Sequence, residues 1–182
     1  MSFLMKVVVG GKIPKKLLKR TFQIDPDSLL EARGFDFALH GTWVREKSIK
    51  LQFWILNAPF SDSDRSSLYY ASLGLIVFFQ KNHKRSFRDV PLWFNAFKKH
   101  SGRHLKSYPK ECLVLIGTAN NHEVITSENG SSLAHKFGMA YYETSPNPTE
   151  TARIMTEIFT KMAEAYLNYV ETLQSMPGAN HS

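Results

Sequence analysis

Residues 73–79 read Leu73-Gly-Leu-Ile-Val-Phe-Phe79, an apolar run of the length typical of a strand that is buried on both faces of a sheet. Similar runs stand at residues 4–9, Leu4-Met-Lys-Val-Val-Val9, and at residues 112–116, Cys112-Leu-Val-Leu-Ile116. Strands of this kind occur in parallel sheets, in which a helix usually returns the chain to the same edge. The three runs therefore predict an α/β fold.

The segments between these runs have the patterns of helices and of one hairpin. Asp89 is expected to cap the second helix, and Asn147 the last one, with Glu150 completing a capping box. The expected elements are helices at residues 15–22, 90–100, 131–137 and from 148 onward, hairpin strands at 36–45 and 48–54, and a last strand at 139–142. The sheet should be mostly parallel, with one antiparallel edge strand and helices on both faces.

The chain has 182 residues and a formal net charge of +7, from 23 Lys and Arg against 16 Asp and Glu. That length fits one domain, which we place at residues 1–174, followed by a short flexible tail at 175–182. No apolar run approaches the roughly 20 residues that span a bilayer. The single cysteine, Cys112, excludes an intramolecular disulfide framework and a cysteine-based zinc site, and it favours an intracellular, cytoplasmic location.

The positive charge gathers at residues 12–20, 81–88 and 98–110. A basic surface can attract anionic lipid or nucleic acid, so a module that binds either polyanion stays open as an alternative function. A solvated face that aids solubility is the simpler interpretation, because no zinc-finger spacing and no aromatic RNA-binding signature accompanies the lysines. We therefore expect no nucleic-acid partner.

Several short segments stand in a fixed order between residues 5 and 170: Gly34-Phe-Asp-Phe37, Lys50-Leu-Gln-Phe-Trp54, Tyr69-Tyr70, Ser86-Phe87 with Trp93, and Glu143-Thr-Ser145. In order and spacing they resemble segments of the Ras-superfamily small GTPases, and more narrowly of the Rab proteins. The resemblance implies a P-loop NTPase-like small GTPase fold with a six-stranded, mostly parallel sheet. In that family the sheet carries a site for GTP or GDP with Mg²⁺.

The phosphate loop of the family reads G-x-x-x-x-G-K-[ST], and the same register here reads Gly10-Gly-Lys-Ile-Pro-Lys15-Lys16-Leu17. Gly10 and Lys16 match the first glycine and the lysine. Lys15 stands in place of the second glycine, where the family's backbone approaches a phosphate. Leu17 replaces the hydroxyl residue that ligates Mg²⁺ and has no oxygen to offer.

The switch segments also depart from the family's pattern. The switch I threonine, which binds Mg²⁺ and the γ-phosphate in the family, corresponds to Ala32. The switch II motif Asp-x-x-Gly-Gln corresponds to residues 55–59, with Ile55 at the metal-linked aspartate and Ala58 at the glycine. Pro59 stands at the glutamine that orients the attacking water.

The base-recognition motif Asn-Lys-x-Asp corresponds to residues 118–121, so Thr118 and Asn121 replace its asparagine and its aspartate. The aspartate of the family accepts two hydrogen bonds from guanine, whereas the amide of Asn121 presents a donor beside its acceptor. The closing Ser-Ala-Lys motif keeps only its serine, Ser145.

If each lost polar contact costs ~1–3 kcal/mol, five losses remove on the order of 5–15 kcal/mol of nucleotide binding. We therefore expect a pseudo-GTPase, meaning a chain that is not an enzyme, needs no cofactor and acts as an interaction subunit in a trafficking or transport complex. A divergent GTPase that binds GTP or GDP with Mg²⁺ through Gly10, Lys16 and Ser145 stays open as the alternative.

The resemblance also implies a surface for protein partners. Rab proteins present an aromatic triad to their effectors, and its members correspond here to Phe37, Trp54 and Tyr69. The alternative is that Phe37 and Trp54 are packed residues of the hairpin. Residues 176–182 contain no cysteine, so we expect no prenylation, and membrane recruitment only through a partner.

Overall fold

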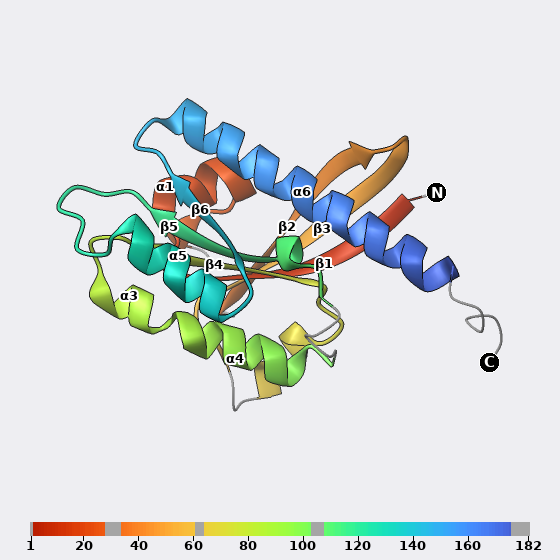
Figure 1. The fold of residues 1–182 in the computed structure, drawn as a ribbon, viewed down its shortest axis with the longest axis horizontal. Helices are drawn as coiled ribbons and strands as arrows, with labels where there is room; N and C mark the ends of the chain where they lie inside the picture. The colour runs from red at the N-terminus through yellow and green to blue at the C-terminus, as the bar shows by residue number, and fades with distance from the viewer. Residues whose placement is uncertain (1, 28–33, 61–63, 103–107, 176–182) are drawn as a thin grey trace.

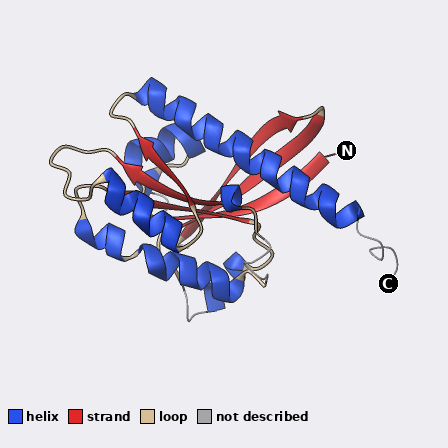
Figure 2. Ribbon diagram, in the orientation of Figure 1, coloured by secondary structure: helices blue, strands red, loops and turns tan. Residues whose placement is uncertain are grey.

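The computed structural model describes residues 2–27, 34–60, 64–102 and 108–175. Its described strands form one six-stranded sheet, with helices packed around it (Figure 1, Figure 2). The strands lie in the order β2-β3-β1-β4-β5-β6. Their bounds are β1 Ser2–Gly11, β2 Phe35–Val44, β3 Lys47–Leu56, β4 Gly74–Gln80, β5 Leu113–Thr118 and β6 Ala140–Thr144. All neighbours pair in parallel except β2 with β3, which confirms the predicted α/β class with one antiparallel edge strand.

Helices cover both faces of the sheet, because the central strands are apolar on both sides (Figure 2). One core packs α6 and the segment after β1 against the sheet, and the other packs α4 and α5. The helices are α1 Lys15–Leu17, α3 Lys84–Arg88, α4 Val90–His100, α5 Ser127–Lys136 and α6 Pro148–Ser175. Within the described ranges, none of them combines the length and apolarity that crossing a bilayer requires.

The helix predicted at residues 15–22 begins where expected but changes from α-helical to π-helical geometry along its length. Three α-helical residues, Lys15–Leu17, are followed by a π-helical turn, Leu18–Phe22, which ends at Gln23 in the left-handed conformation. Its apolar residues Leu17, Leu18 and Phe22 are buried.

Two helix starts differ from their predictions. Asp89 makes no side-chain cap for α4, because the short helix α3 runs directly into it. The helix predicted at 131–137 begins earlier, at Ser127, because Thr126 and Asn129 form a reciprocal capping box. By contrast, Asn147 caps α6 as predicted, since its Oδ1 accepts hydrogen bonds from the N–H groups of Thr149 and Glu150.

The β2–β3 hairpin is joined to the last helix at its turn. Arg45 and Glu46 adopt positive φ angles there, and Arg45 and Lys47 both form ion pairs with Glu171 of α6. The division into a domain at 1–174 and a tail at 175–182 stays a prediction, because residues 176–182 lie outside the described part of the chain.

Gly10 is required by packing, since a Cβ atom built there would lie 2.2 Å from Cζ3 of Trp93. Gly10→Ala should therefore lower the free energy of unfolding by about 1–3 kcal/mol, through overpacking. Gly41→Ala is the matched control, because nothing lies within 4 Å of its Cβ position, and it should be neutral or stabilising by up to about 1 kcal/mol. Urea unfolding measures both, and equal effects of the two substitutions would contradict the packing argument.

Candidate functional site

A cavity of about 640 Å³ lies where the loops after β5 and β6 meet the start of α1. These loops follow the carboxyl ends of parallel strands, the edge at which open α/β sheets bind ligands (Figure 1). The polar and charged side chains that line the cavity are Lys16, Arg20, Thr21, His40, Thr118, Asn120, Asn121, Glu123, Thr144, Ser145, Thr151 and Thr156. Of the nucleotide-site positions predicted from sequence, it brings together Lys16, Leu17, Thr118, Asn121 and Ser145.

The loop after β1 uses part of its backbone for its own structure. Gly11 has φ of +86°, and the N–H of Lys12 donates to the carbonyl oxygen of Phe78 at 2.8 Å. The carbonyl of Pro14 accepts from the N–H groups of Leu17 and Leu18 at 2.9 and 3.0 Å. These N–H groups therefore donate to the chain itself and not to a bound phosphate.

Lys15 and Lys16 have different surroundings. Lys15 forms an exposed ion pair with Asp27, with 3.3 Å between Nζ and Oδ1, so it does not fill the cavity. Lys16 lines the cavity.

A Mg²⁺ ion does not fit the positions that would hold it in the family. Leu17 and Ile55 are buried in the apolar core that packs against α6, and neither has a ligand atom. Ala32 lies outside the described residues. Among the residues that the structure describes, no group of three or more His, Cys, Asp or Glu side chains gathers as metal ligands would.

The remaining switch II positions lie away from the cavity. Ala58 and Pro59 line a second hollow of about 380 Å³, together with Gly11, Lys12 and Trp93. The carbonyl oxygen of Pro59 accepts a hydrogen bond from the hydroxyl of Tyr69.

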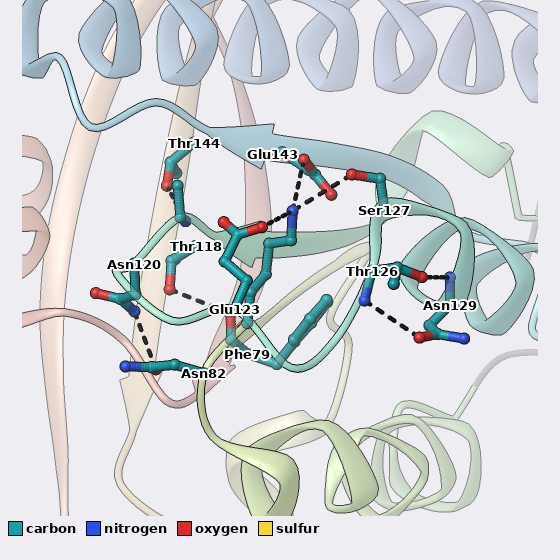
Figure 3. A network of polar contacts seen from close by, with 12 residues as sticks. Phe79, Asn82, Thr118, Asn120, Glu123, Thr126, Ser127, Asn129, Glu143 and Thr144 are labelled. Atoms are coloured by element: carbon teal, nitrogen blue, oxygen red, sulfur yellow. Dashed lines mark hydrogen bonds and ion pairs between the residues drawn. The ribbon is translucent and has the colours of Figure 1, made fainter.

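The loop after β5 is held by hydrogen bonds to its neighbours (Figure 3). The hydroxyl of Thr118 donates to the carbonyl of Phe79 at 3.2 Å, and the N–H of Ala119 donates to Oγ1 of Thr144 at 3.2 Å. Asn120 reaches Asn82 at 3.3 Å, and the exposed Asn121 lines the cavity. The loop therefore presents a fixed backbone with amide side chains at the site.

A buried lysine cluster supports this loop, and sequence reasoning missed it. The ammonium of Lys81 lies 2.8 Å from Oε2 of Glu123 and 3.2 Å from Oε2 of Glu143, and it donates to Oγ of Ser127 at 3.3 Å. Figure 3 shows these three partners pointing toward one another. The sequence contains one signal for this cluster: Lys81 directly follows a buried apolar strand, and a charge at that place needs partners.

The two sides of this cluster hold each other ionised. Burial disfavours the charged form of Lys81, but the hydrogen bonds and negative charges of Glu123 and Glu143 outweigh it and raise its pKa. Burial also acts to raise the pKa of Glu143, but hydrogen bonds from Tyr141, Ser127 and Lys81 outweigh it, so its pKa is lowered. The cluster therefore links β4, β6 and the loop after β5 by charge-assisted bonds.

Of the three residues predicted to contact partners, Phe37 and Trp54 lie side by side on the hairpin and Tyr69 is buried. The rings of Phe37 and Trp54 lie 5.6 Å apart, and the Lys6 ammonium lies 4.9 Å from the Trp54 ring centroid. The prediction for Tyr69 needs correction, because its side chain has 0% exposure and its hydroxyl is bonded internally. The next residue, Tyr70, is 67% exposed.

Replacing Lys81 by methionine should change how stability depends on pH. In the native chain the lowered pKa of Glu143 contributes stability above the pKa of an unfolded glutamate, and this contribution is lost as pH falls through the lowered value. Without the ammonium, Glu123 and Glu143 repel each other, but both are partly exposed, so K81M should lose about 1–3 kcal/mol near pH 7 and lose less on acidification to about pH 4. Urea unfolding at several pH values measures both effects.

Lys84→Met is the control for this substitution, because Lys84 is exposed on α3. K84M should keep the stability and the pH profile of the native chain. Matching profiles for K81M and K84M would show that the buried cluster contributes nothing.

Three relatives illustrate where the chain belongs. Ras-related protein SEC4 of Saccharomyces cerevisiae is 24% identical over 168 residues, covering 88% of this chain and 74% of that protein. Ras-related protein RABD1 of Arabidopsis thaliana is 27% identical over 152 residues, covering 79% and 71%. GTP-binding protein ypt2 of Schizosaccharomyces pombe is 24% identical over 152 residues, covering 79% and 73%.

A sequence model of the Ras family matches residues 15–168. This range includes five of the six strands and both loops that line the cavity on the side of β5 and β6. The match contradicts the prediction that the chain is not an enzyme, because the family is one of GTPases. The chain belongs to the Ras family and is similar to its Rab proteins.

Proposed function

We propose that the chain is a divergent Rab-like GTPase that holds a guanine nucleotide in the cavity, with side chains that differ from the usual ligands of its family. One observation carries this proposal: α1 and the loops after β5 and β6 line a single cavity of about 640 Å³, within the size range of small-molecule sites. The position of the cavity, at the carboxyl ends of the strands, supports the same function.

Lys16 and Arg20 provide the positive charge at this site. Both line the cavity and come from α1 and the turn that follows it. A bound Mg²⁺ neutralises phosphate oxygens in nucleotide sites generally. Since Leu17 and Ile55 offer no ligand atom, we assign that neutralising charge to the two cationic side chains.

Hydrolysis by this chain requires a water-orienting group outside the switch II motif. Pro59 has neither an N–H nor a polar side chain, and it lines the second hollow instead of the cavity. A polar group elsewhere in the chain, or one supplied by a partner protein, must then orient the attacking water.

The chain also presents a face to protein partners in intracellular trafficking. Phe37 and Trp54 stand opposite each other on β2 and β3, and Phe37 keeps 40% of its surface exposed. Leu39 and Trp43 follow on the same face of β2, with 60% and 73% exposure. Clustered exposed aromatic residues are typical anchors of protein interfaces, and such a partner could also supply attachment to a membrane.

Nucleotide binding should depend on Lys16 and not on Mg²⁺. The dissociation constant for GDP should change by less than about threefold between buffers with Mg²⁺ and with EDTA, and Lys16→Ala should weaken binding about tenfold or more, through loss of a charge-assisted contact. Lys19→Ala is the matched control, since Lys19 is exposed on the turn that follows α1 and does not line the cavity. Calorimetric titration measures all four values.

Two results would count against this proposal. GDP binding that disappears in EDTA would mean that a metal site exists after all. No GDP binding at millimolar concentration, with or without Mg²⁺, would reject the nucleotide function.

Partner binding should depend on the hairpin face. The double substitution Phe37→Ala and Trp54→Ala removes two adjacent ring surfaces and should weaken capture of cytosolic proteins by the immobilised chain about tenfold or more. Leu92→Ala is the control, because Leu92 is a similarly exposed apolar residue on α4. Quantitative mass spectrometry of the captured proteins gives the measurement, and undiminished capture by the double variant would exclude this face.

A further inference from the structure

The charges that line the cavity are unequally distributed between its walls. The cationic Lys16 and Arg20 come from α1 and the turn after it, whereas Glu123 comes from the loop after β5. Among the described residues that line the cavity, Glu123 is the one carboxylate. A ligand that is anionic at one end and rich in hydrogen-bond donors at the other matches this distribution.

Glu123 is held in place before any ligand arrives. Its Oε2 lies 2.8 Å from the ammonium of Lys81, whose side chain is only 5% exposed. The N–H groups of the next two residues, Val124 and Ile125, donate to the carbonyl oxygen of Lys81 at 2.9 and 2.8 Å. Backbone and side chain are thus both anchored at Lys81, while the Glu123 side chain keeps 37% of its surface exposed.

A carboxylate in this position suits one purine base better than the others. An ionised carboxylate only accepts hydrogen bonds. Guanine presents two adjacent donors, N1–H and the 2-amino group, whereas hypoxanthine lacks the 2-amino group and adenine pairs its amino group with an acceptor. A site whose acceptors are placed for a donor of the ligand binds an analogue without that donor more weakly, because the acceptors of the site are then left unpaired.

We infer that Glu123 reads the guanine base in this chain, in place of the aspartate whose position Asn121 occupies. This inference rests on the proposed nucleotide function. Asn121 lines the same cavity, but its amide brings a donor that faces the donors of guanine. Glu123 supplies carboxylate oxygens that only accept, and one of them, Oε2, is also paired with the Lys81 ammonium that positions the carboxylate.

The test compares three nucleoside diphosphates, GDP, IDP and ADP, in calorimetric titrations of the full chain in EDTA. Diphosphates are chosen because their binding is read without turnover. The native chain should bind GDP about tenfold or more tighter than IDP or ADP. In Glu123→Gln, the affinity for GDP should fall about tenfold or more, and the affinity for IDP should fall less. The ratio of the GDP affinity to the IDP affinity should therefore be no more than about three in this variant.

The variant Glu143→Gln distinguishes recognition of the base by Glu123 from a general effect of losing one partner of Lys81. Glu143 also contacts the Lys81 ammonium, but it does not line the cavity. E143Q should therefore keep the native GDP-to-IDP ratio. Thermal unfolding of each variant establishes that it is folded, and the preference of the native chain for GDP tests the inference even where a variant fails to fold.

The outcomes distinguish this inference from the proposed function. A native chain that binds all three nucleotides equally, or an E123Q variant that keeps the native ratio, would overturn the role of Glu123 and leave nucleotide binding intact. An E143Q variant that stays folded and loses the preference for GDP while E123Q keeps it would overturn it as well, because base recognition would then not depend on the Glu123 carboxylate. A native chain that binds no nucleotide would overturn the proposed function and this inference together.

Discussion

The burial of β1, β4 and β5 on both faces is the constraint on which the rest of the molecule depends. Each of these strands sends alternate apolar side chains into two separate cores, so each needs helices above and below it. Parallel strands that satisfy this requirement end at a common edge, and their connections must leave from it. The cavity exists because two of those connections and the start of α1 meet at that edge.

The same constraint explains why polar chemistry is confined to the strand ends. Lys81 follows the last residue of β4, and its backbone N–H still bonds to Thr118 beside it, at 3.1 Å. An ammonium in this location is removed from water and must be compensated by negative charge. Glu123 and Glu143 provide it from segments far away in the sequence, and the cluster therefore fixes the loop that lines the cavity.

The elements of the fold were predictable because the signals are local. The central strands are continuous apolar runs. In α6, Asn147 and Pro148 mark the start of the helix, and apolar residues that recur every three or four positions mark its buried face. The start of α5 was missed because its first residues, from Ser127 to Ser132, are polar or glycine and carry no apolar period. The sequence of the π-helical turn after α1 also has no local pattern that distinguishes it from an α-helix.

The site was less predictable, because its contacts join distant segments. Sequence motifs located the residues of the cavity, but no spacing rule links positions 81, 123 and 143. The pair Tyr69-Tyr70 shows a second limit: one tyrosine is fully buried and the other is exposed. Two identical neighbours cannot be told apart by composition, since the direction of each side chain is set by the backbone of the short helix that ends there.

The ion pairs that join Arg45 and Lys47 to Glu171 have a mechanical consequence. They connect the tip of the β2–β3 hairpin to the far end of α6, so a displacement of the hairpin pulls on the helix. All three side chains are at least one-third exposed, which makes the connection weak and sensitive to ionic strength. Dissolved salt should therefore weaken the contact between the hairpin tip and the end of α6.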